Sequence, residues 1–174
     1  MKKRESVLLI PILSLEPLVK SLRNKYDPSS LCGIPTHVTI LCPFKNPDYI
    51  VKKVIAKLRF IFLKERGFQF TLQRINTFPG VVFLDPLERD PFIVLTEKVV
   101  KAFPEHLPYE GTFTEINPHL TIGHKLGDKF DQALMETKRK IEDKLPIKAR
   151  AQEVWLMESE NGMWKILEKF PLLI

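Results

Sequence analysis

His37-Val38-Thr39-Ile40 and His119-Leu120-Thr121-Ile122 are two copies of one short pattern, and they decide the fold expected for this chain. Each copy has the order histidine, apolar, threonine, apolar, and each follows a proline, Pro35 in the first case and Pro118 in the second. The two histidines stand 82 positions apart in a chain of 174 residues. This spacing predicts one copy in each of two similar lobes.

Alternation along a β-strand decides where the side chains of each tetrapeptide point. Residues two apart in a strand share a face, and their neighbours take the opposite face. A strand through each copy therefore presents its histidine and threonine together and directs two apolar side chains toward a core. Two such strands side by side would bring two imidazoles and two hydroxyls to one site.

The side chains gathered in this way suit phosphoryl chemistry without a metal ion. Imidazole titrates at about pH 6.5, so one histidine can accept a proton while the other donates one. Threonine hydroxyls can donate hydrogen bonds to phosphate oxygens. A single histidine in a strand is more often structural, and it is the matched second copy that favours a shared site. We therefore predict a catalytic set of His37, Thr39, His119 and Thr121.

Apolar periodicity and turn residues predict the remaining elements. Helices are expected over 15–26, 51–62, 92–103 and 130–145, and strands over 6–12, 36–42, 68–72, 81–84, 112–114, 119–123, 153–157 and 163–167. Asn161-Gly162 predicts a tight hairpin between the last two strands. Strands and helices mix without a regular βαβ repeat, which favours an α+β fold with antiparallel sheets. No glycine- or serine-rich linker divides the chain, so residues 1–174 are expected to form a single domain of two lobes.

Composition and charge exclude several classes of protein. The chain is 44% hydrophobic and 28% charged, as is typical of globular domains, and it has no apolar run long enough to cross a membrane. The basic and then apolar start is interrupted at Pro11 and Glu16, which favours a first strand over a signal peptide. Two cysteines make no disulfide framework, so a reducing cytoplasm is the expected location. The net charge of +6 favours anionic partners without selecting RNA over a mononucleotide.

Two further residues are candidates for substrate binding. Phe83 could stack on a base, although a strand phenylalanine more often belongs to the core. Lys125 falls on the same parity as His119 and Thr121 and could reach a phosphate, although a solvated lysine is the more common case. His124 falls on the opposite, core-facing parity and is expected to be structural.

The other histidine and the cysteines offer no convincing site. His106 lies in a loop flanked by prolines and is expected at the surface. The spacing of Cys32, His37 and Cys42 matches no common zinc pattern, so no metal site is predicted.

Blocks of residues beyond the tetrapeptides resemble the 2H phosphoesterase superfamily, and in particular its 2′-5′ RNA ligase-like family. The family is defined by two His-x-Thr or His-x-Ser motifs, which His37/Thr39 and His119/Thr121 match. The similar blocks follow in order through nearly the whole chain, over 26–28, 33–44, 78–84, 113–122, 155–157, 162–164 and 170–172.

The resemblance implies a fold and a set of roles. The fold is two pseudo-symmetric α+β lobes, with antiparallel sheets that line a central cleft and helices on the outside. His37 and His119 would form the acid–base pair, and Thr39 and Thr121 would donate hydrogen bonds to the phosphate. Members of the family work on 2′,3′-cyclic phosphates or 2′-5′ linkages without an obligatory metal or cofactor.

These observations predict a metal-independent phosphodiesterase that opens 2′,3′-cyclic phosphates on RNA ends or on small cyclic nucleotides. The same site run backwards would be a weak 2′-5′ RNA ligase. The chain is expected to act as a monomer without a membrane partner. The alternative to an enzyme is a nucleotide- or RNA-binding module with the same fold and no catalytic activity. A purely structural protein is a third possibility.

Overall fold

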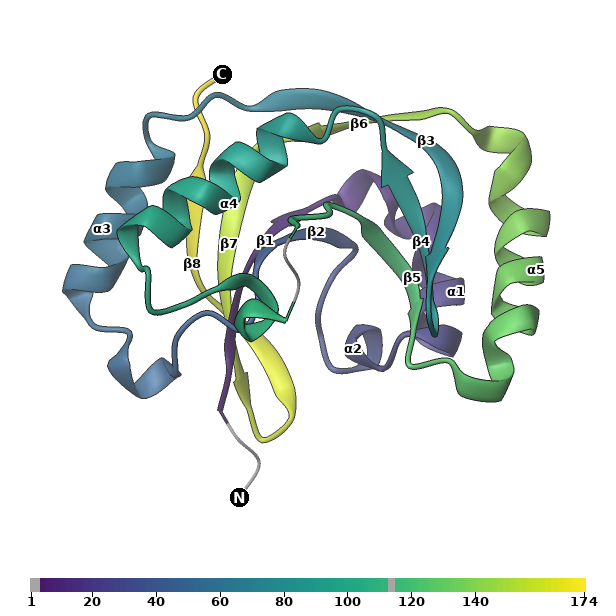
Figure 1. Ribbon diagram of the computed structural model, residues 1–174, viewed down its shortest axis with the longest axis horizontal. Helices are drawn as coiled ribbons and strands as arrows, with labels where there is room; N and C mark the ends of the chain where they lie inside the picture. Colours follow the sequence, from purple (N-terminus) through teal and green to yellow (C-terminus); the bar gives the residue numbers. More distant parts are fainter. Residues whose placement is uncertain (1–3, 113–114) are drawn as a thin grey trace.

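Two four-stranded antiparallel sheets form the centre of the molecule (Figure 1), as the computed structural model shows for residues 4–112 and 115–174. The first sheet has the strand order β2-β1-β7-β8 and the second the order β5-β4-β3-β6. The strands are β1 (Ser6–Pro11), β2 (His37–Leu41), β3 (Phe68–Phe78), β4 (Val81–Pro86), β5 (Leu120–His124), β6 (Ile147–Ala151), β7 (Glu153–Glu160) and β8 (Met163–Pro171). The predicted α+β class with antiparallel sheets is confirmed.

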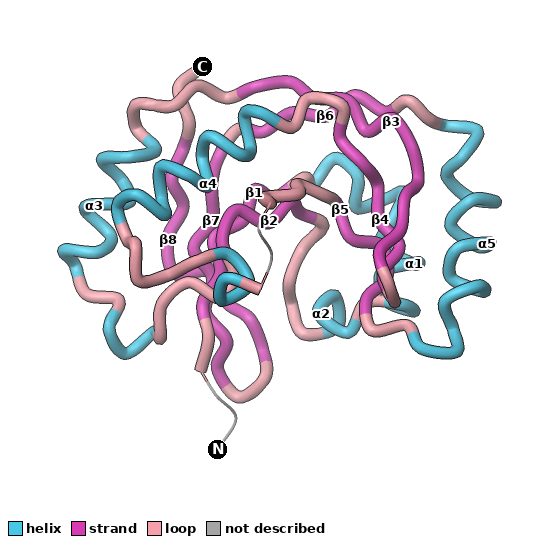
Figure 2. Tube along the Cα trace, viewed as in Figure 1, coloured by secondary structure: helices cyan, strands magenta, loops and turns pink. Residues whose placement is uncertain are grey.

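Helices cover one face of each sheet, and Figure 2 shows them in cyan around the magenta strands. They are α1 (Glu16–Tyr26), the short α2 (Pro28–Leu31), α3 (Lys52–Phe62), α4 (Asp90–Ala102) and α5 (Phe130–Ile141). The helices α3 and α4 pack on the first sheet, whereas α1 and α5 pack on the second. In the described part of the chain, no helix is long and apolar enough to cross a membrane.

Of the two apolar clusters that the described residues form, the larger runs between the helices and both sheets. Alternate strand residues enter it, among them Val38, Ile40, Leu120 and Ile122, which are 0–2% exposed. The opposite face of the strands, called the site face below, carries the histidine and threonine of each tetrapeptide. On the first sheet the site face also holds a smaller apolar cluster of Val7, Leu9, Ile34, Trp155 and Met157.

Most predicted elements appear within a few residues of their expected bounds, and the differences have local causes. Strand β6 was not predicted, because small alanines alternate with charged residues and give a weak apolar signal. The fourth predicted helix stops as an α-helix at Ile141 and continues as a 3-10 turn to Lys144. Of the strand predicted over 112–114, Thr112 lies in a turn, and Phe113 and Thr114 lie outside the described residues.

The hairpin at Asn161-Gly162 is confirmed. Both residues have positive φ, 53° and 84°, which is the backbone that a tight two-residue hairpin requires. The turn joins β7 and β8, which pair along their length from Glu160↔Met163 to Glu153↔Pro171.

Candidate active site

The two tetrapeptides meet where the two sheets meet. Strands β2 and β5 are the edge strands of their sheets, and they lie in contact with each other. His37 is the first residue of β2, and His119 immediately precedes β5. The charges of the two imidazoles act on one another, since His119 contributes to the pKa of His37. The structure therefore brings together the two halves of the predicted site.

Strand alternation places each threonine beside its histidine, in agreement with the sequence pattern. His37 pairs with Pro11 and Thr39 with Leu9 on β1, so both lie on the site face of the first sheet. Thr121 pairs with Phe83 on the second sheet. The four polar residues are partly exposed, whereas the apolar residues between them are buried.

Both imidazoles are oriented by the same backbone contact. The Nδ1 atom of His37 lies 2.7 Å from the carbonyl oxygen of Pro35, and that of His119 lies 2.7 Å from the carbonyl oxygen of Asn117. A carbonyl can only accept, so Nδ1 carries the proton in both rings. The neutral rings therefore keep Nε2 as the nitrogen available for proton transfer.

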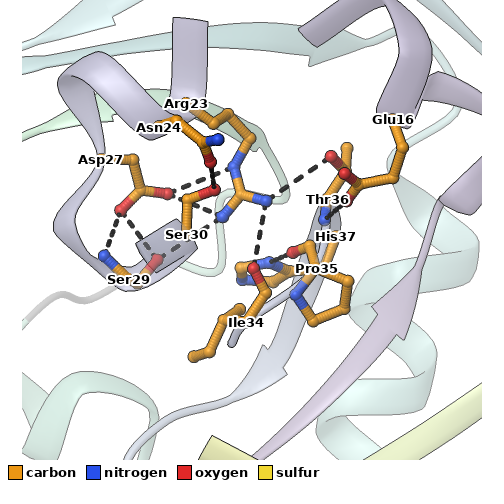
Figure 3. A network of polar contacts seen from close by, with 10 residues as sticks. All are labelled: Glu16, Arg23, Asn24, Asp27, Ser29, Ser30, Ile34, Pro35, Thr36 and His37. Carbon is orange, nitrogen blue, oxygen red and sulfur yellow. Dashed lines mark hydrogen bonds and ion pairs between the residues drawn. The ribbon is translucent and has the colours of Figure 1, made fainter. Parts of the chain in front are cut away.

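A buried guanidinium holds the loop that leads into His37 (Figure 3). Arg23 on α1 is 1% exposed and pairs with Asp27, which is 3% exposed, at 2.8 Å. Its Nη1 donates to the carbonyl oxygen of Ile34 at 3.3 Å and to Oγ1 of Thr36 at 3.5 Å. Arg23 is thus bonded to two of the three residues that precede His37.

Two carboxylates complete this network. Asp27 accepts the backbone N–H of Ser29 at 3.0 Å and so caps α2, a helix that is not among those predicted from the sequence. Glu16 at the start of α1 accepts the backbone N–H of Thr36 at 2.6 Å. Sequence reasoning missed these roles. Asp27-Pro28 is a visible helix-start signal, but nothing local connects it to His37.

Strand β8 holds the same loop from its other side. The backbone N–H of Trp164 donates to the carbonyl oxygen of Cys32 at 2.7 Å. The next residue, Gly33, has φ +97°, and a Cβ there would lie 2.9 Å from the carbonyl oxygen of Trp164. The close approach of the two backbones therefore requires a glycine at this position.

Burial and nearby charges lower the pKa of both histidines. Burial lowers the pKa of His37 to about 4, and the nearby positive charge of Arg23 acts in the same direction. Burial also lowers the pKa of His119, and the positive charges of His124 and Arg89 act in the same direction. The Asn117 carbonyl and the Asp85 carboxylate oppose this shift. With a pKa of about 4, His37 is neutral at pH 7 and can accept a proton.

Phe83 is a buried residue that packs against His119 and not an exposed one that could contact a substrate base. Its side chain has no exposed surface, so the prediction that it could stack on a substrate base is wrong. The ring centroid lies 4.3 Å from that of Phe78 and 5.1 Å from that of His119. Phe83 packs against the His119 imidazole and supports its orientation.

A β-bulge in β5 changes the faces of the residues that follow Thr121. Thr121 pairs with Phe83 but Gly123 pairs with Val82, so Ile122 is the extra residue. His124 then pairs with Val81, which puts it on the face of Phe83 and Thr121. His124 is exposed, so the prediction that it faces the core is wrong.

Lys125 lies beyond the end of the strand. It is exposed and has φ +56°, so the parity that predicted its contact with a phosphate does not extend to it. Its positive charge contributes, after burial, to a lowered pKa of His124. In residues 4–112 and 115–174, no group of three or more histidine, cysteine, aspartate or glutamate side chains could hold a metal ion.

Solved structures with a similar fold include nucleotide-bound proteins. E. coli LigT in complex with NADP+ aligns with a TM-score of 0.61 at 15% identity over the whole of both chains. The same protein has been solved with 3′-AMP, with a TM-score of 0.58. The protein TT0787 of Thermus thermophilus aligns with a TM-score of 0.66 at 20% identity over 97% of each chain. At these identities the likeness shows the fold alone.

Sequence comparison shows the family. A protein of Bacillus cytotoxicus with a phosphoesterase name is 27% identical over 169 residues, and one of Halalkalibacterium halodurans is 30% identical over 171 residues. Both alignments cover 95% of this chain and 95% of the relative. The family model of the 2′-5′ RNA ligase superfamily matches residues 11–163, on which both tetrapeptides lie. With this match over most of its length, the chain belongs to the 2′-5′ RNA ligase superfamily, and the resemblance to the 2H phosphoesterases is confirmed.

Proposed function

We propose that this protein is a metal-independent phosphodiesterase that opens 2′,3′-cyclic phosphates on RNA ends or nucleotides. One observation carries the proposal: two His-x-Thr pairs lie on adjoining edge strands, and each imidazole keeps Nε2 available. Two such imidazoles can supply both proton transfers of the hydrolysis, so no metal-bound water is needed. Membership of the superfamily supports the same class of reaction.

The hydrolysis divides the proton transfers between the two histidines. His37, neutral because of its low pKa, accepts a proton from water through Nε2 as the water oxygen attacks phosphorus. The bond from phosphorus to one ribose oxygen breaks, and His119 in its protonated form donates its Nε2 proton to that oxygen. The bound anionic phosphate favours the protonated form of His119. The product is a phosphomonoester beside a free hydroxyl, and solvent restores both histidines.

The threonines stabilise charge on the phosphate. Thr39 and Thr121 would donate Oγ–H hydrogen bonds to the two non-bridging oxygens, where charge develops during the attack. With a 5′-hydroxyl of RNA in place of water, the same attack on the cyclic phosphate would form a 2′-5′ linkage as the bond from phosphorus to the 3′ oxygen breaks and His119 protonates that oxygen. Weak ligase activity is therefore part of the proposal.

The experiment that tests the proposal follows the end group of a short RNA with a 2′,3′-cyclic phosphate, incubated in EDTA. Wild type should open the ring, and His37→Ala should not. His106→Ala is the matched control, because His106 contacts Lys45 and Phe44, which lie outside the two tetrapeptides. Inhibition by EDTA would contradict the metal-independent mechanism. Tight binding of the RNA with no ring opening would favour the non-catalytic binding module instead.

A further inference from the structure

Three polar side chains on the site face of the second sheet surround a buried carboxylate. Asp85 on β4 has no exposed surface. It accepts the Nε–H of Arg74 on β3 at 2.8 Å and the Nδ2–H of Asn76 at 3.3 Å. Its other oxygen accepts Nη2–H of Arg89, the residue that precedes α4. One carboxylate thus holds two guanidinium groups, which leaves one net positive charge.

The strand register puts this cluster next to His119. Leu84 pairs with Leu120 and Phe83 with Thr121, so the next residue, Asp85, lies across from His119 on the same face as Phe83. Arg74 pairs with Asp85 on the far side. Because neighbouring strands are about 5 Å apart, Asp85 lies roughly one strand spacing from His119, and Arg74 reaches Asp85 from β3, one strand further away. Asp85 and Arg89 also act electrostatically on His119.

The two arginines are oriented by Asp85, but each keeps N–H groups that bond to no atom of the described residues. The side chain of Arg74 is 60% exposed and that of Arg89 is 35% exposed, in contrast to the buried carboxylate between them. Within residues 4–112 and 115–174, Arg74 donates a hydrogen bond from Nε but from neither of its terminal nitrogens. Arg89 donates from Nε and from only one of its two terminal nitrogens. Guanidinium groups oriented in this way match the oxygens of a phosphate, to which arginine can donate two bonds at once.

We propose that Arg74 and Arg89 bind the phosphodiester adjacent to the reacting phosphate, so that the preferred substrate is an oligonucleotide end and not a mononucleotide. A mononucleotide has no second phosphate and gains nothing from this cluster. The inference rests on the proposed function for the reaction, but the cluster is a binding site of its own. Its contribution can therefore be measured apart from turnover.

The first test compares two substrates with the same terminal base: a trinucleotide that ends in a 2′,3′-cyclic phosphate, and the cyclic mononucleotide. Wild type should favour the trinucleotide in kcat/KM by about 10-fold or more, the usual effect of hydrogen bonds to a charged group. Arg74→Gln and Arg89→Gln should each reduce this ratio about 10-fold. Arg59→Gln on α3 is the matched control, because Arg59 is 59% exposed, is paired with Glu168 at 3.0 Å, and should leave the ratio unchanged.

The second test measures binding without turnover, by fluorescence anisotropy of a 5′-labelled trinucleotide with a 3′-phosphate. Arg74→Gln and Arg89→Gln should weaken its binding, and Arg74→Lys, which keeps a charge beside Asp85, should weaken it less. Thermal melts followed by circular dichroism identify variants that fail to fold. A ratio and an affinity that both stay at the wild-type value in folded Arg74→Gln and Arg89→Gln would overturn the inference. If neither cyclic substrate is opened but binding falls as described, the proposed hydrolysis fails and the phosphate site stands.

Discussion

At the scale of single residues, the candidate site is a pair of imidazoles that share one orientation and differ in their surroundings. Each donates its Nδ1 proton to the carbonyl two residues earlier, at 2.7 Å. His37 lies near the buried pair of Arg23 and Asp27. His119 packs against Phe83 and lies near His124, Asp85 and Arg89. Two imidazoles with the same orientation but different neighbouring groups can have different pKa values, as a general base and a general acid require.

The loss of a histidine of the candidate site should reduce turnover more than the loss of a threonine. His37→Ala and His119→Ala should each lower kcat about 10²- to 10⁴-fold, because each removes one of two proton transfers. Thr39→Ala and Thr121→Ala should cost about 10- to 1000-fold, as hydrogen-bond donors to developing charge. Steady-state kinetics on the cyclic substrate measures both effects. A histidine variant as active as wild type would show that the two-histidine mechanism is wrong.

The pH at which kcat/KM is highest should lie below the ordinary pKa of histidine. Protonation of His37 removes the base, so activity should fall as the pH drops toward the His37 pKa of about 4. Deprotonation of His119 removes the acid, and its lowered pKa sets the alkaline limb below about pH 6.5. Rates at constant ionic strength, with the cyclic mononucleotide below KM, measure this profile. An optimum above pH 7 is the contrary result.

At the scale of elements, contacts from a helix and a strand fix the position of the loop of residues 32–36. Helix α1 binds it through Arg23 and Glu16, and β8 binds it through the backbone of Trp164. These contacts come from two segments far apart in the chain. They determine where β2 begins and therefore where His37 lies.

Removal of the buried charge on α1 should change the titration of His37. Arg23→Gln alone would leave Asp27 charged and buried, which typically costs about 3–5 kcal/mol of stability. The double variant Arg23→Gln/Asp27→Asn avoids this, and it should raise the His37 pKa because the larger of the two opposing charge effects is that of Arg23. Proton NMR titration of the imidazole measures the shift. A pKa that is unchanged in the folded double variant would mean that Arg23 acts on His37 through geometry alone.

A side chain at Gly33 should destabilise the contact between this loop and β8. Gly33→Ala combines a positive φ of 97° with a Cβ only 2.9 Å from a carbonyl oxygen, so the unfolding free energy should fall by about 1–3 kcal/mol. Gly127→Ala is the matched control. Gly127 also has a positive φ, of 49°, but nothing lies within 4 Å of its Cβ position. Urea denaturation measures both variants, and an equal loss in the two would refute the role of the close approach.

At the scale of the whole molecule, we call each sheet with the helices that pack on it a lobe, and each lobe is packed by a helix that connects two strands of the other lobe. The segments β1–α1–β2 and β4–α4–β5 each consist of a strand, a helix and a strand that contains or follows one of the two paired histidines. Helix α1 packs on β5 of the second sheet, and α4 packs on β2 of the first. On the α4 side, the buried Thr96 donates its hydroxyl to the carbonyl oxygen of Ile40 or of Phe92, at 2.9 and 3.0 Å. Each strand of the candidate site is therefore supported by a helix from the other half of the chain.

This arrangement of the helices predicts that the lobes unfold together. Both tryptophans lie on the first sheet and report its packing by fluorescence, whereas far-ultraviolet circular dichroism reports the helices of both lobes. The two signals should show one coincident transition in urea, because one continuous core connects both lobes. Separate midpoints would show that the lobes are independent units and would contradict the expectation of a single domain.

Features that depend on neighbours along the chain could be predicted from the amino-acid order. Alternation in a strand needs only the order of His37, Val38, Thr39 and Ile40, so the faces of the tetrapeptides follow without knowledge of the fold. Helix periodicity and the Asn161-Gly162 turn are local in the same way. The superfamily could also be named from ordered blocks of residues, because its motifs are short and contiguous.

Features that join residues distant in sequence became visible only in the folded molecule. The repeated tetrapeptide predicts a shared site, but it does not show that β2 and β5 meet as the edge strands of two sheets. The burial of Arg23 beside His37 and the pairing of Asp85 with two arginines join segments that no sequence pattern connects. The bulge at Ile122 shows the same limit on a smaller scale. One extra residue relative to β4 turns His124 to the site face, and that register is set by the partner strand and not by the order of residues in β5 alone.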